Sequence, residues 1–236
     1  SFSIELDSTA QISYIYIMSY KIVVVGSSDG LGLALVNQLK DHHSCLIWGR
    51  DESKTSHVAN NLQLPFVVAD LCDYSLVEQA MESASSQLSG IDIVVNCVGV
   101  WSQGYLHDQS YELIQNIMQT NAIGSIWVAK TSFKFLRQSD NNPLLINVIS
   151  QDGLSAKALR AAYTSSKFAM TGLTKSIQID WQKYNIAVTG VYPGPFKSNL
   201  FIKAGVQRDF SQSLEVDTVA TQISNLINQS EDRPQE

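Results

Sequence analysis

The sequence is poor in cysteine, in positive charge and in long apolar runs. Only three of its 236 residues are cysteines, and none forms a CxxC pair. We therefore expect reduced, buried thiols, no metal site, and a reducing compartment, the cytoplasm. Lysine and arginine number 16 against 22 acidic residues, which argues against a surface for nucleic acid or for an anionic membrane. No apolar run approaches the roughly 20 residues that a membrane-spanning helix needs.

The first residues carry no mark of a secretory signal. Residues 1–17 include Glu5 and Asp7 and contain no lysine or arginine. Met18 stands directly before the first strong strand pattern. We therefore expect Met18 to be the natural start, residues 1–17 to be an N-terminal extension or a cloning remnant, and residues 18–236 to form a single domain.

Short apolar runs alternate with helical patterns along the rest of the chain. The runs predict buried strands at residues 21–25, 45–48, 65–69, 91–96, 144–149 and 186–192. Apolar residues at helical spacing predict helices at 31–39, 73–88, 111–136, 161–183 and 216–227. Strands separated by helices imply right-handed crossovers, and therefore an α/β fold with a Rossmann-type, doubly wound parallel sheet. The ligand crevice of such a sheet lies beyond the carboxyl ends of its strands.

A glycine-rich turn joins the first strand to the first helix. It reads Val25-Gly26-Ser27-Ser28-Asp29-Gly30-Leu31-Gly32, a GxxxGxG spacing. Glycine is needed where the backbone turns sharply or approaches a phosphate, and the N–H groups that begin a helix attract a pyrophosphate. We interpret the turn as a site for the phosphates of a dinucleotide, made by Gly26, Ser28, Asp29, Gly30, Leu31 and Gly32. A loop that merely needs flexibility is the alternative.

The end of the second strand carries Gly49-Arg50 in place of an acidic residue. A carboxylate at this position would bond the ribose 2′-hydroxyl of NAD, whereas a guanidinium suits the 2′-phosphate of NADP. Arg50 begins what reads as a polar loop, so a solvated surface arginine is the alternative. Asp51 and Asp29 are nearby acids that would weaken a preference for NADP(H). We predict NADP(H) as the preferred cofactor, with NAD(H) as the second choice.

Tyr163 and Lys167 form a YxxxK pair on a helical stretch. Residues four apart share one helix face, so the phenol and the ammonium can point into the same pocket. A neighbouring cation favours phenolate and lowers the pKa of tyrosine from its usual value of about 10. Because YxxxK arises often by chance, an exposed helical pair is the alternative. Ser150 ends the fifth strand thirteen residues before Tyr163, where its hydroxyl can bond a substrate carbonyl.

In this order and spacing, these segments resemble the short-chain dehydrogenase/reductase family, from about Lys21 to the last helix. The resemblance implies that Ser150, Tyr163 and Lys167 are catalytic, and that Asn121 supports a water-linked proton relay to Lys167. It also implies cofactor contacts by Asp70, Leu71, Asn96, Gly99, Tyr163, Lys167, Pro193, Gly194, Phe196 and Ser198. Plainer alternatives are a helix cap at Asp70 and ordinary turns at the glycines and prolines. Family members usually add a seventh strand, which the polar residues 230–236 do not offer.

We therefore predict an NADP(H)-dependent oxidoreductase that transfers hydride between nicotinamide and a small carbonyl or alcohol. Side chains that follow strand ends are candidates for the substrate pocket: Trp101, Gln103, Gln151, Asp152, Leu154, Phe196 and Phe201. Residues 200–210 are a candidate lid. A nucleotide sensor without turnover and an adaptor are the alternatives, and the intact Ser150, Tyr163 and Lys167 favour the enzyme. The resemblance also implies a homodimer or homotetramer, built on the helices at 111–136 and 161–183.

Overall fold

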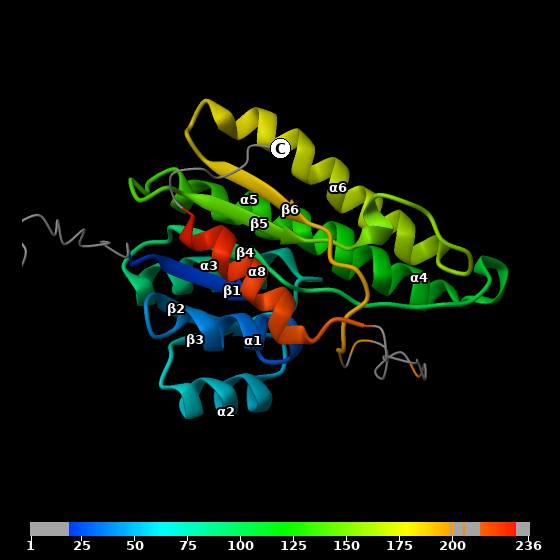
Figure 1. Cartoon of the computed structure of the whole chain (residues 1–236), viewed down its shortest axis with the longest axis horizontal. Coiled ribbons are helices and arrows are strands. Elements are labelled where there is room, and N and C mark those ends of the chain that lie inside the picture. The colour runs from blue at the N-terminus through cyan, green and yellow to red at the C-terminus, as the bar shows by residue number, and fades with distance from the viewer. Residues whose placement is uncertain (1–18, 199, 201–204, 206–212, 230–236) are drawn as a thin grey trace, which may run out of the picture.

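The computed structural model describes residues 19–198, 200, 205 and 213–229 of the chain. The predictions for residues 1–17 and 230–236 lie outside the described residues, as do Phe201 and most of the predicted lid. Six parallel strands form one sheet in the order β3-β2-β1-β4-β5-β6. Figure 1 shows this sheet through the middle of the molecule, with helices on both of its sides. The predicted Rossmann-type, doubly wound parallel sheet is confirmed.

The strands are short and mostly apolar. They are β1 (Lys21–Val25), β2 (Ser44–Gly49), β3 (Phe66–Val68), β4 (Ile93–Asn96), β5 (Leu144–Val148) and β6 (Ala187–Val191). β4 and β5 are buried along their whole length, and β1 along all but its first residue. A parallel strand that is covered on both faces needs apolar side chains on both, which explains the uninterrupted runs of valine, isoleucine and leucine.

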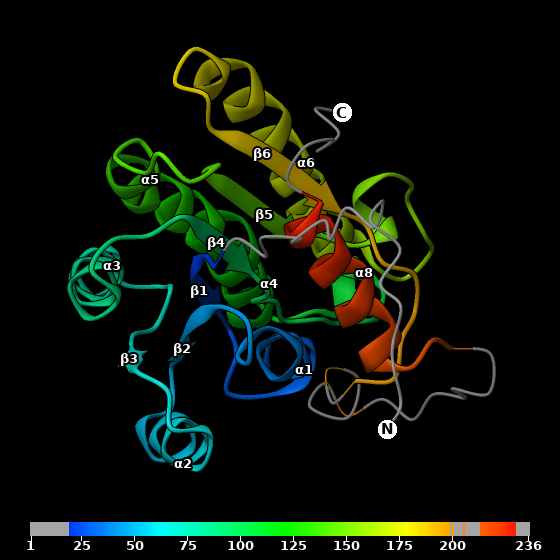
Figure 2. The same cartoon turned by 60° about the vertical axis from the view of Figure 1, so that its left-hand side comes forward.

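The helices cover the sheet in two layers. One face packs against α1 (Gly30–Leu39), α2 (Glu52–Leu62) and α8 (Val216–Asn228). The other face packs against α3 (Tyr74–Leu88), α5 (Gly124–Leu136) and α6 (Ala161–Gln182). Figure 2 shows α1 beside α8 on one side of the sheet and α3 and α5 on the other. None of the described helices combines the length and the apolar character that crossing a bilayer requires.

The prediction that a polar loop begins at Arg50 is wrong, because helix α2 begins two residues later, at Glu52. Asp51 caps this helix, and its carboxylate accepts a hydrogen bond of 2.8 Å from the Lys54 backbone N–H. Only Thr55 and Ala59 of the helix are buried. A helix that buries so little lacks the apolar stripe by which a sequence pattern finds helices.

Two further local predictions need correction. The helix predicted at 111–136 is divided into α4 (Tyr111–Ile117), a π-helical segment η2 (Met118–Ile123) and α5. The thiols are all free, but only Cys45 is buried, since Cys97 is partly exposed and Cys72 is exposed. Cys72 lies in the turn after β3, where its backbone N–H donates to Asp70 Oδ1 at 2.9 Å and leaves the side chain outside the core.

Candidate active site

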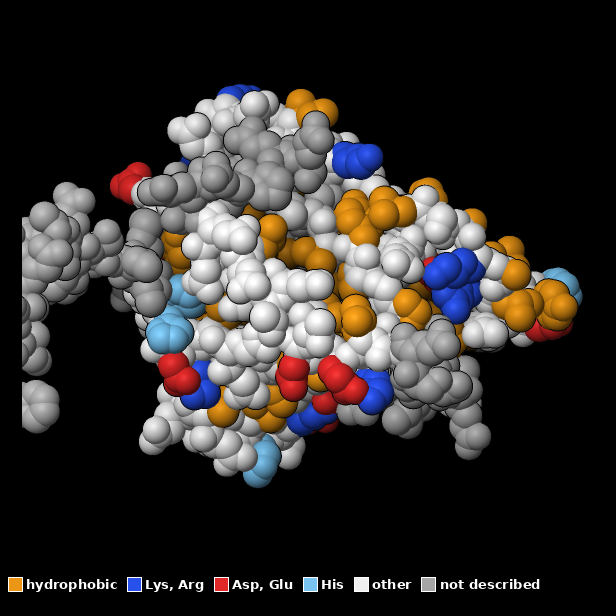
Figure 3. Space-filling view, viewed as in Figure 1, with side chains coloured by type: hydrophobic (Ala, Val, Ile, Leu, Met, Phe, Trp, Pro, Cys, Tyr) orange, Lys and Arg blue, Asp and Glu red, His pale blue; other side chains and the backbone are white. Residues whose placement is uncertain are grey.

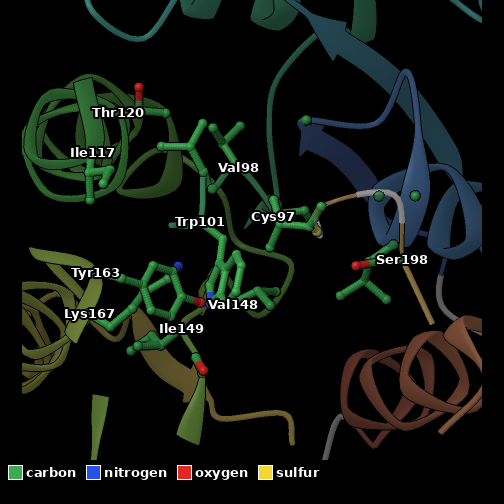
Figure 4. A pocket seen from close by; sticks show the side chains of 18 of the residues that line it. Cys97, Val98, Trp101, Ile117, Thr120, Val148, Ile149, Tyr163, Lys167 and Ser198 are labelled. Atoms are coloured by element: carbon green, nitrogen blue, oxygen red, sulfur yellow. The ribbon is translucent and has the colours of Figure 1, made fainter. Parts of the chain in front are cut away.

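A cavity of about 500 Å³ opens beyond the carboxyl ends of the strands. Crevices form in such sheets where the strand order reverses, here between β1 and β4. The predicted site residues that line it are Gly26, Ser28, Asp29, Gly30, Leu31, Gly32, Arg50, Asp70, Leu71, Gly99, Ser150, Tyr163, Lys167, Pro193, Gly194, Phe196 and Ser198. Asn96 and Asn121 lie outside its lining. Figure 4 shows Tyr163 and Lys167 on one side of the cavity and Ser198 on the other.

The glycine turn is held tightly to the end of β2. The backbone N–H groups of Gly26 and Ser27 both donate to the Trp48 carbonyl oxygen, at 2.9 and 3.0 Å. A Cβ on Gly32 would lie 2.4 Å from the Gly26 carbonyl oxygen, so no other residue fits there without moving backbone. A Cβ on Gly30, in contrast, would meet no protein atom within 4 Å. The turn therefore packs closely on its own backbone at Gly32 and is open at Gly30.

Both acids near Arg50 are engaged within the protein. Asp51 caps α2, as described above. Asp29 caps α1 by accepting from the Gly30 backbone N–H at 2.8 Å, and its second oxygen lies 2.6 Å from Lys54 Nζ. Arg50 is exposed and lines the cavity. This corner of the cavity therefore carries an arginine, together with a lysine that compensates the charge of Asp29.

Asp70 and Asn96 hold turns at the ends of β3 and β4. The alternative of Asp70 as a helix cap is wrong, because Asp73 caps α3. Asn96 is fully buried, its amide donates to Ser125 Oγ at 2.9 Å, and its Oδ1 accepts from the Val98 backbone N–H at 3.2 Å. These bonds tie the end of β4 to α5. Asn96 therefore supports the cavity wall from behind, and its cofactor contact stays a prediction.

Tyr163 is buried beside Ser150. Burial raises the pKa of the Tyr163 phenol to about 12, and a hydrogen bond with the Ser150 hydroxyl partly opposes this effect. Lys167 Nζ lies 5.8 Å from the centroid of the Tyr163 ring. The expected lowering of the Tyr163 pKa by Lys167 is therefore not found; the cation that lowers this pKa is Arg160, and burial outweighs its effect. The phenol is protonated at neutral pH.

Lys167 is the most thoroughly desolvated cation of the cavity. Its side chain is buried, and burial lowers its pKa to about 8. Within the described part of the chain, the ammonium donates one hydrogen bond, to the Met170 thioether sulfur at 3.3 Å. Gly99 leaves room beside it, because a Cβ there would lie 3.4 Å from Lys167 Nζ. The ammonium is therefore placed to donate to a polar group that enters the cavity.

Replacing this lysine should stabilise the protein. Below pH 8 both the folded and the unfolded states carry the charge, and only the folded state loses hydration. Between pH 8 and 10.5 the folded state releases the proton first, so the free-energy cost of burying the Lys167 charge falls as the pH rises. We expect Lys167→Met to raise the free energy of unfolding by about 3 kcal/mol at pH 7, and by much less near pH 10. Urea denaturation without nucleotide measures both values. Lys175→Met, an exposed change on the same helix, should show no such pH dependence.

Asn121 lies behind the cavity, in the π-helical segment η2. Its Oδ1 accepts from the Val100 backbone N–H at 2.8 Å. Its amide donates to the Val100 carbonyl oxygen and to Ser166 Oγ, both at 2.9 Å. Asn121 therefore joins the loop after β4 to the turn of α6 that carries Lys167. Both amide donors are used in these bonds, and the predicted role in a water relay stays a prediction.

Several cavity residues were not identified from the sequence. Of the candidates for the substrate pocket, Trp101, Gln151, Asp152 and Phe196 line the cavity, whereas Gln103 and Leu154 do not. The missed residues include Trp48, Cys97, Val98, Ile117, Thr120, Lys157 and Arg160. Cys97 and Val98 stand in the segment between Asn96 and Gly99, so their position could have signalled them. Lys157 and Arg160 belong to an irregular loop and have no such signal.

The model of one protein family covers most of the chain. The family described as short chain dehydrogenase matches residues 20–209. The chain belongs to the short-chain dehydrogenase family. The resemblance noted in the sequence is thereby confirmed, and the family is one of oxidoreductases.

Three known proteins illustrate how this member of the short-chain dehydrogenase family relates to others. The 3-dehydrosphinganine reductase of Danio rerio is 28% identical over 184 residues, which cover 73% of this chain and 55% of that reductase. The chain thus spans about half the length of that relative. The trans-4-hydroxycyclohexanecarboxylate dehydrogenase of Sinomonas cyclohexanicum is 27% identical, covering 85% of this chain and 76% of that enzyme. An alcohol dehydrogenase from the archaeon Thermococcus sibiricus, complexed with 5-hydroxy-NADP, superposes with a TM-score of 0.80 at 19% identity, covering 91% of this chain and 92% of its own.

Proposed function

We propose that this chain is an NADP(H)-dependent oxidoreductase that reduces a small carbonyl compound to an alcohol. The observation that carries the proposal is the meeting of Ser150, a protonated Tyr163 and a buried Lys167 in one cavity with the glycine turn. The names of the Danio rerio and Sinomonas cyclohexanicum relatives, a reductase and a dehydrogenase, support the same class of reaction.

The cavity fits a nicotinamide dinucleotide along its length. The glycine turn, open at Gly30 and followed by the N-terminus of α1, suits a pyrophosphate. The Lys167 ammonium, whose bonding partner among the described residues is a thioether sulfur, suits ribose hydroxyls at the other end. Gly99 leaves the space that such a ribose needs. A bound nicotinamide supplies or accepts a hydride.

The protein side chains then bind the substrate and donate one proton to it. The Ser150 hydroxyl bonds the carbonyl oxygen and places it beside the Tyr163 phenol. Because the pKa of Tyr163 is about 12, the phenol holds its proton at neutral pH and donates it to that oxygen as the alcohol forms.

The preference for NADP(H) rests on the corner around Arg50. Lys54 compensates Asp29 and Asp51 is used as a helix cap, so neither acid opposes a 2′-phosphate with a full charge. We expect NADPH to bind at least tenfold more tightly than NADH. Arg50→Gln should weaken NADPH binding about tenfold and leave NADH binding nearly unchanged. Lys54→Gln, which exposes the charge of Asp29, should act in the same direction with a smaller effect.

Nucleotide fluorescence in separate NADPH and NADH titrations measures these affinities. Arg137→Gln, an exposed arginine at the end of α5, is the matched control and should change neither. Equal or tighter binding of NADH by the wild type would contradict the assignment of Arg50. Binding of NADPH without turnover of any carbonyl would identify a sensor, and binding of neither nucleotide would favour an adaptor.

We also propose that the protein assembles as a homodimer or homotetramer. The helices expected to pair carry large exposed apolar side chains, among them Tyr111 (73% exposed) on α4, Ile126 on α5, and Phe168 and Ile179 (75%) on α6. Such side chains are normally covered when they gather on one surface.

The cytoplasmic location stays a prediction.

A further inference from the structure

The cavity wall near Tyr163 carries a charged cluster that the proposed hydride transfer does not use. Its members, Asp152, Lys157 and Arg160, all belong to the segment between β5 and α6. Asp152 lies in a 3-10 turn, η3 (Gln151–Gly153), and is 2% exposed. Its carboxylate accepts from Arg160 Nη1 at 2.9 and 3.3 Å and lies 3.2 Å from Lys157 Nζ. All three residues line the cavity.

The cluster holds more positive charge than its carboxylate can balance. A buried carboxylate needs one well-placed cation, and Asp152 has two. Lys167 adds a third cation to the same end of the cavity. Asp29 and Asp70, the other acids among the described lining residues, follow β1 and β3 at the opposite end. The described residues at the end of the cavity near Tyr163 therefore carry a net positive charge.

Arg160 is held at a fixed place beside the predicted proton donor. Its guanidinium carbon lies 5.6 Å from the centroid of the Trp101 ring, and the Trp101 ring meets the Tyr163 ring edge-on at 6.4 Å. Figure 4 shows Trp101 and Tyr163 together in the cavity. The contacts of Arg160 with Asp152 use one of its nitrogens, and a guanidinium has five N–H donors. The remaining donors suit the oxygens of a carboxylate or a phosphate.

We propose that the substrate is an anionic carbonyl compound, whose carboxylate or phosphate binds Arg160 and Lys157 while its carbonyl oxygen lies between Ser150 and Tyr163. The proposal rests on the proposed function and names its substrate class. Asp152 acts as a positioning residue, because it fixes both cations through its buried carboxylate. A neutral substrate would desolvate this end of the cavity and leave its positive charge uncompensated.

The surface at this end of the molecule is consistent with an approaching anion. Figure 3 shows basic side chains at the end of the molecule where α6 begins, next to exposed apolar side chains. Tyr105, Leu106 and Leu154 are more than half exposed in this part of the chain. Positive charge at the mouth of a cavity raises the local concentration of anions, and the effect weakens as salt is added.

Matched pairs of ketones test the proposal. Each pair holds the carbonyl fixed and differs in charge: levulinate with methyl levulinate, 4-oxocyclohexanecarboxylate with its methyl ester, and dihydroxyacetone phosphate with dihydroxyacetone. With saturating NADPH, we expect kcat/KM of the charged member to exceed that of the neutral one at least tenfold in one or more pairs. The first two pairs report a carboxylate and the third a phosphate. Equal rates, or faster reduction of the neutral members in every pair, would overturn the proposal.

Two variants separate anion binding from a structural role of the cluster. Arg160→Gln should raise KM for the charged ketone at least tenfold and leave the neutral ketone nearly unchanged. Asp152→Asn keeps an oxygen that can accept from Arg160 and removes the competing negative charge, so the preference for the charged ketone should stay at least as large as in the wild type. Arg137→Gln, far from the cavity, is the control for both. If the cluster only supports the fold, both variants will lower the rates of charged and neutral ketones alike, and the proposal fails.

Failure of the proposed function would be distinguishable from failure of this inference. If NADPH binds but no ketone is reduced, the proposed reductase is wrong, and binding then tests the anion site alone. Calorimetric titration of the NADPH complex with levulinate and with methyl levulinate serves this purpose. If levulinate binds to the wild type and Arg160→Gln abolishes this binding, the proposed anion site stands. If levulinate does not bind to the wild type, the proposed anion site is overturned.

Discussion

Replacing Tyr163 with phenylalanine should lower kcat for carbonyl reduction by about 10³-fold and leave NADPH affinity within about twofold of the wild type. The phenol is a buried acid beside Ser150, with a pKa raised to about 12, and phenylalanine has no proton to donate. The ring itself remains, so its edge-to-face contact with Trp101 at 6.4 Å is kept. Structure and cofactor binding should therefore survive the loss of chemistry.

Steady-state rates with NADPH and a carbonyl substrate, together with a fluorescence titration of NADPH, measure the two effects. Tyr184→Phe removes a phenol that packs on Phe133 outside the cavity, and it should leave both quantities unchanged. Ser150→Ala should lower kcat less severely, because it removes a hydrogen bond to the substrate and leaves the proton donor. Turnover of Tyr163→Phe at a rate near that of the wild type would disprove the assignment of the proton donor.

The fold could be predicted because its strands are buried on both faces. The run from Lys21 to Val25 is recognisable as a strand from its composition alone, and α6 from its length and spacing. α2 could not be predicted, since it buries only Thr55 and Ala59. Local pattern therefore predicts the elements that the core demands, and it misses those that lie mostly in solvent.

The candidate site likewise contains residues that the sequence indicates and contacts that only the structure reveals. Ser150, Tyr163 and Lys167 keep regular spacings along a strand end and a helix, so the sequence indicates them directly. The pairing of Asp152 with Arg160 crosses an irregular loop and appears only in three dimensions. The pKa of Tyr163 was expected to fall because Lys167 is its helical neighbour. Burial raises it instead, and the extent of burial depends on the whole fold.

Substitutions in the glycine turn should have the second largest effect, on folding stability and on NADPH affinity. Gly32→Ala and Gly30→Ala should weaken NADPH binding for different reasons. Alanine at Gly32 places a Cβ 2.4 Å from the Gly26 carbonyl oxygen and 2.8 Å from Ser27 Cα, so backbone must move. We expect Gly32→Ala to lose about 1–3 kcal/mol of folding stability and about 100-fold in NADPH affinity. Alanine at Gly30 meets no protein atom within 4 Å, at a φ of +54°. It should lose about 1 kcal/mol through backbone strain, and bind NADPH weakly because its Cβ enters the space assigned to the pyrophosphate.

Thermal or urea unfolding without nucleotide, and NADPH titration of the folded protein, separate these two causes. Gly172→Ala is the matched control, because this exposed helical glycine also has open space at its Cβ. It should gain up to about 1 kcal/mol of stability from the better helix propensity of alanine and bind NADPH normally. If Gly30→Ala and Gly32→Ala both bind NADPH as tightly as the wild type, the pyrophosphate does not lie at this turn. Weak binding by both, with a large loss of stability confined to Gly32→Ala, would show that the turn is shaped by contact with its own backbone at Gly32 and by the ligand at Gly30.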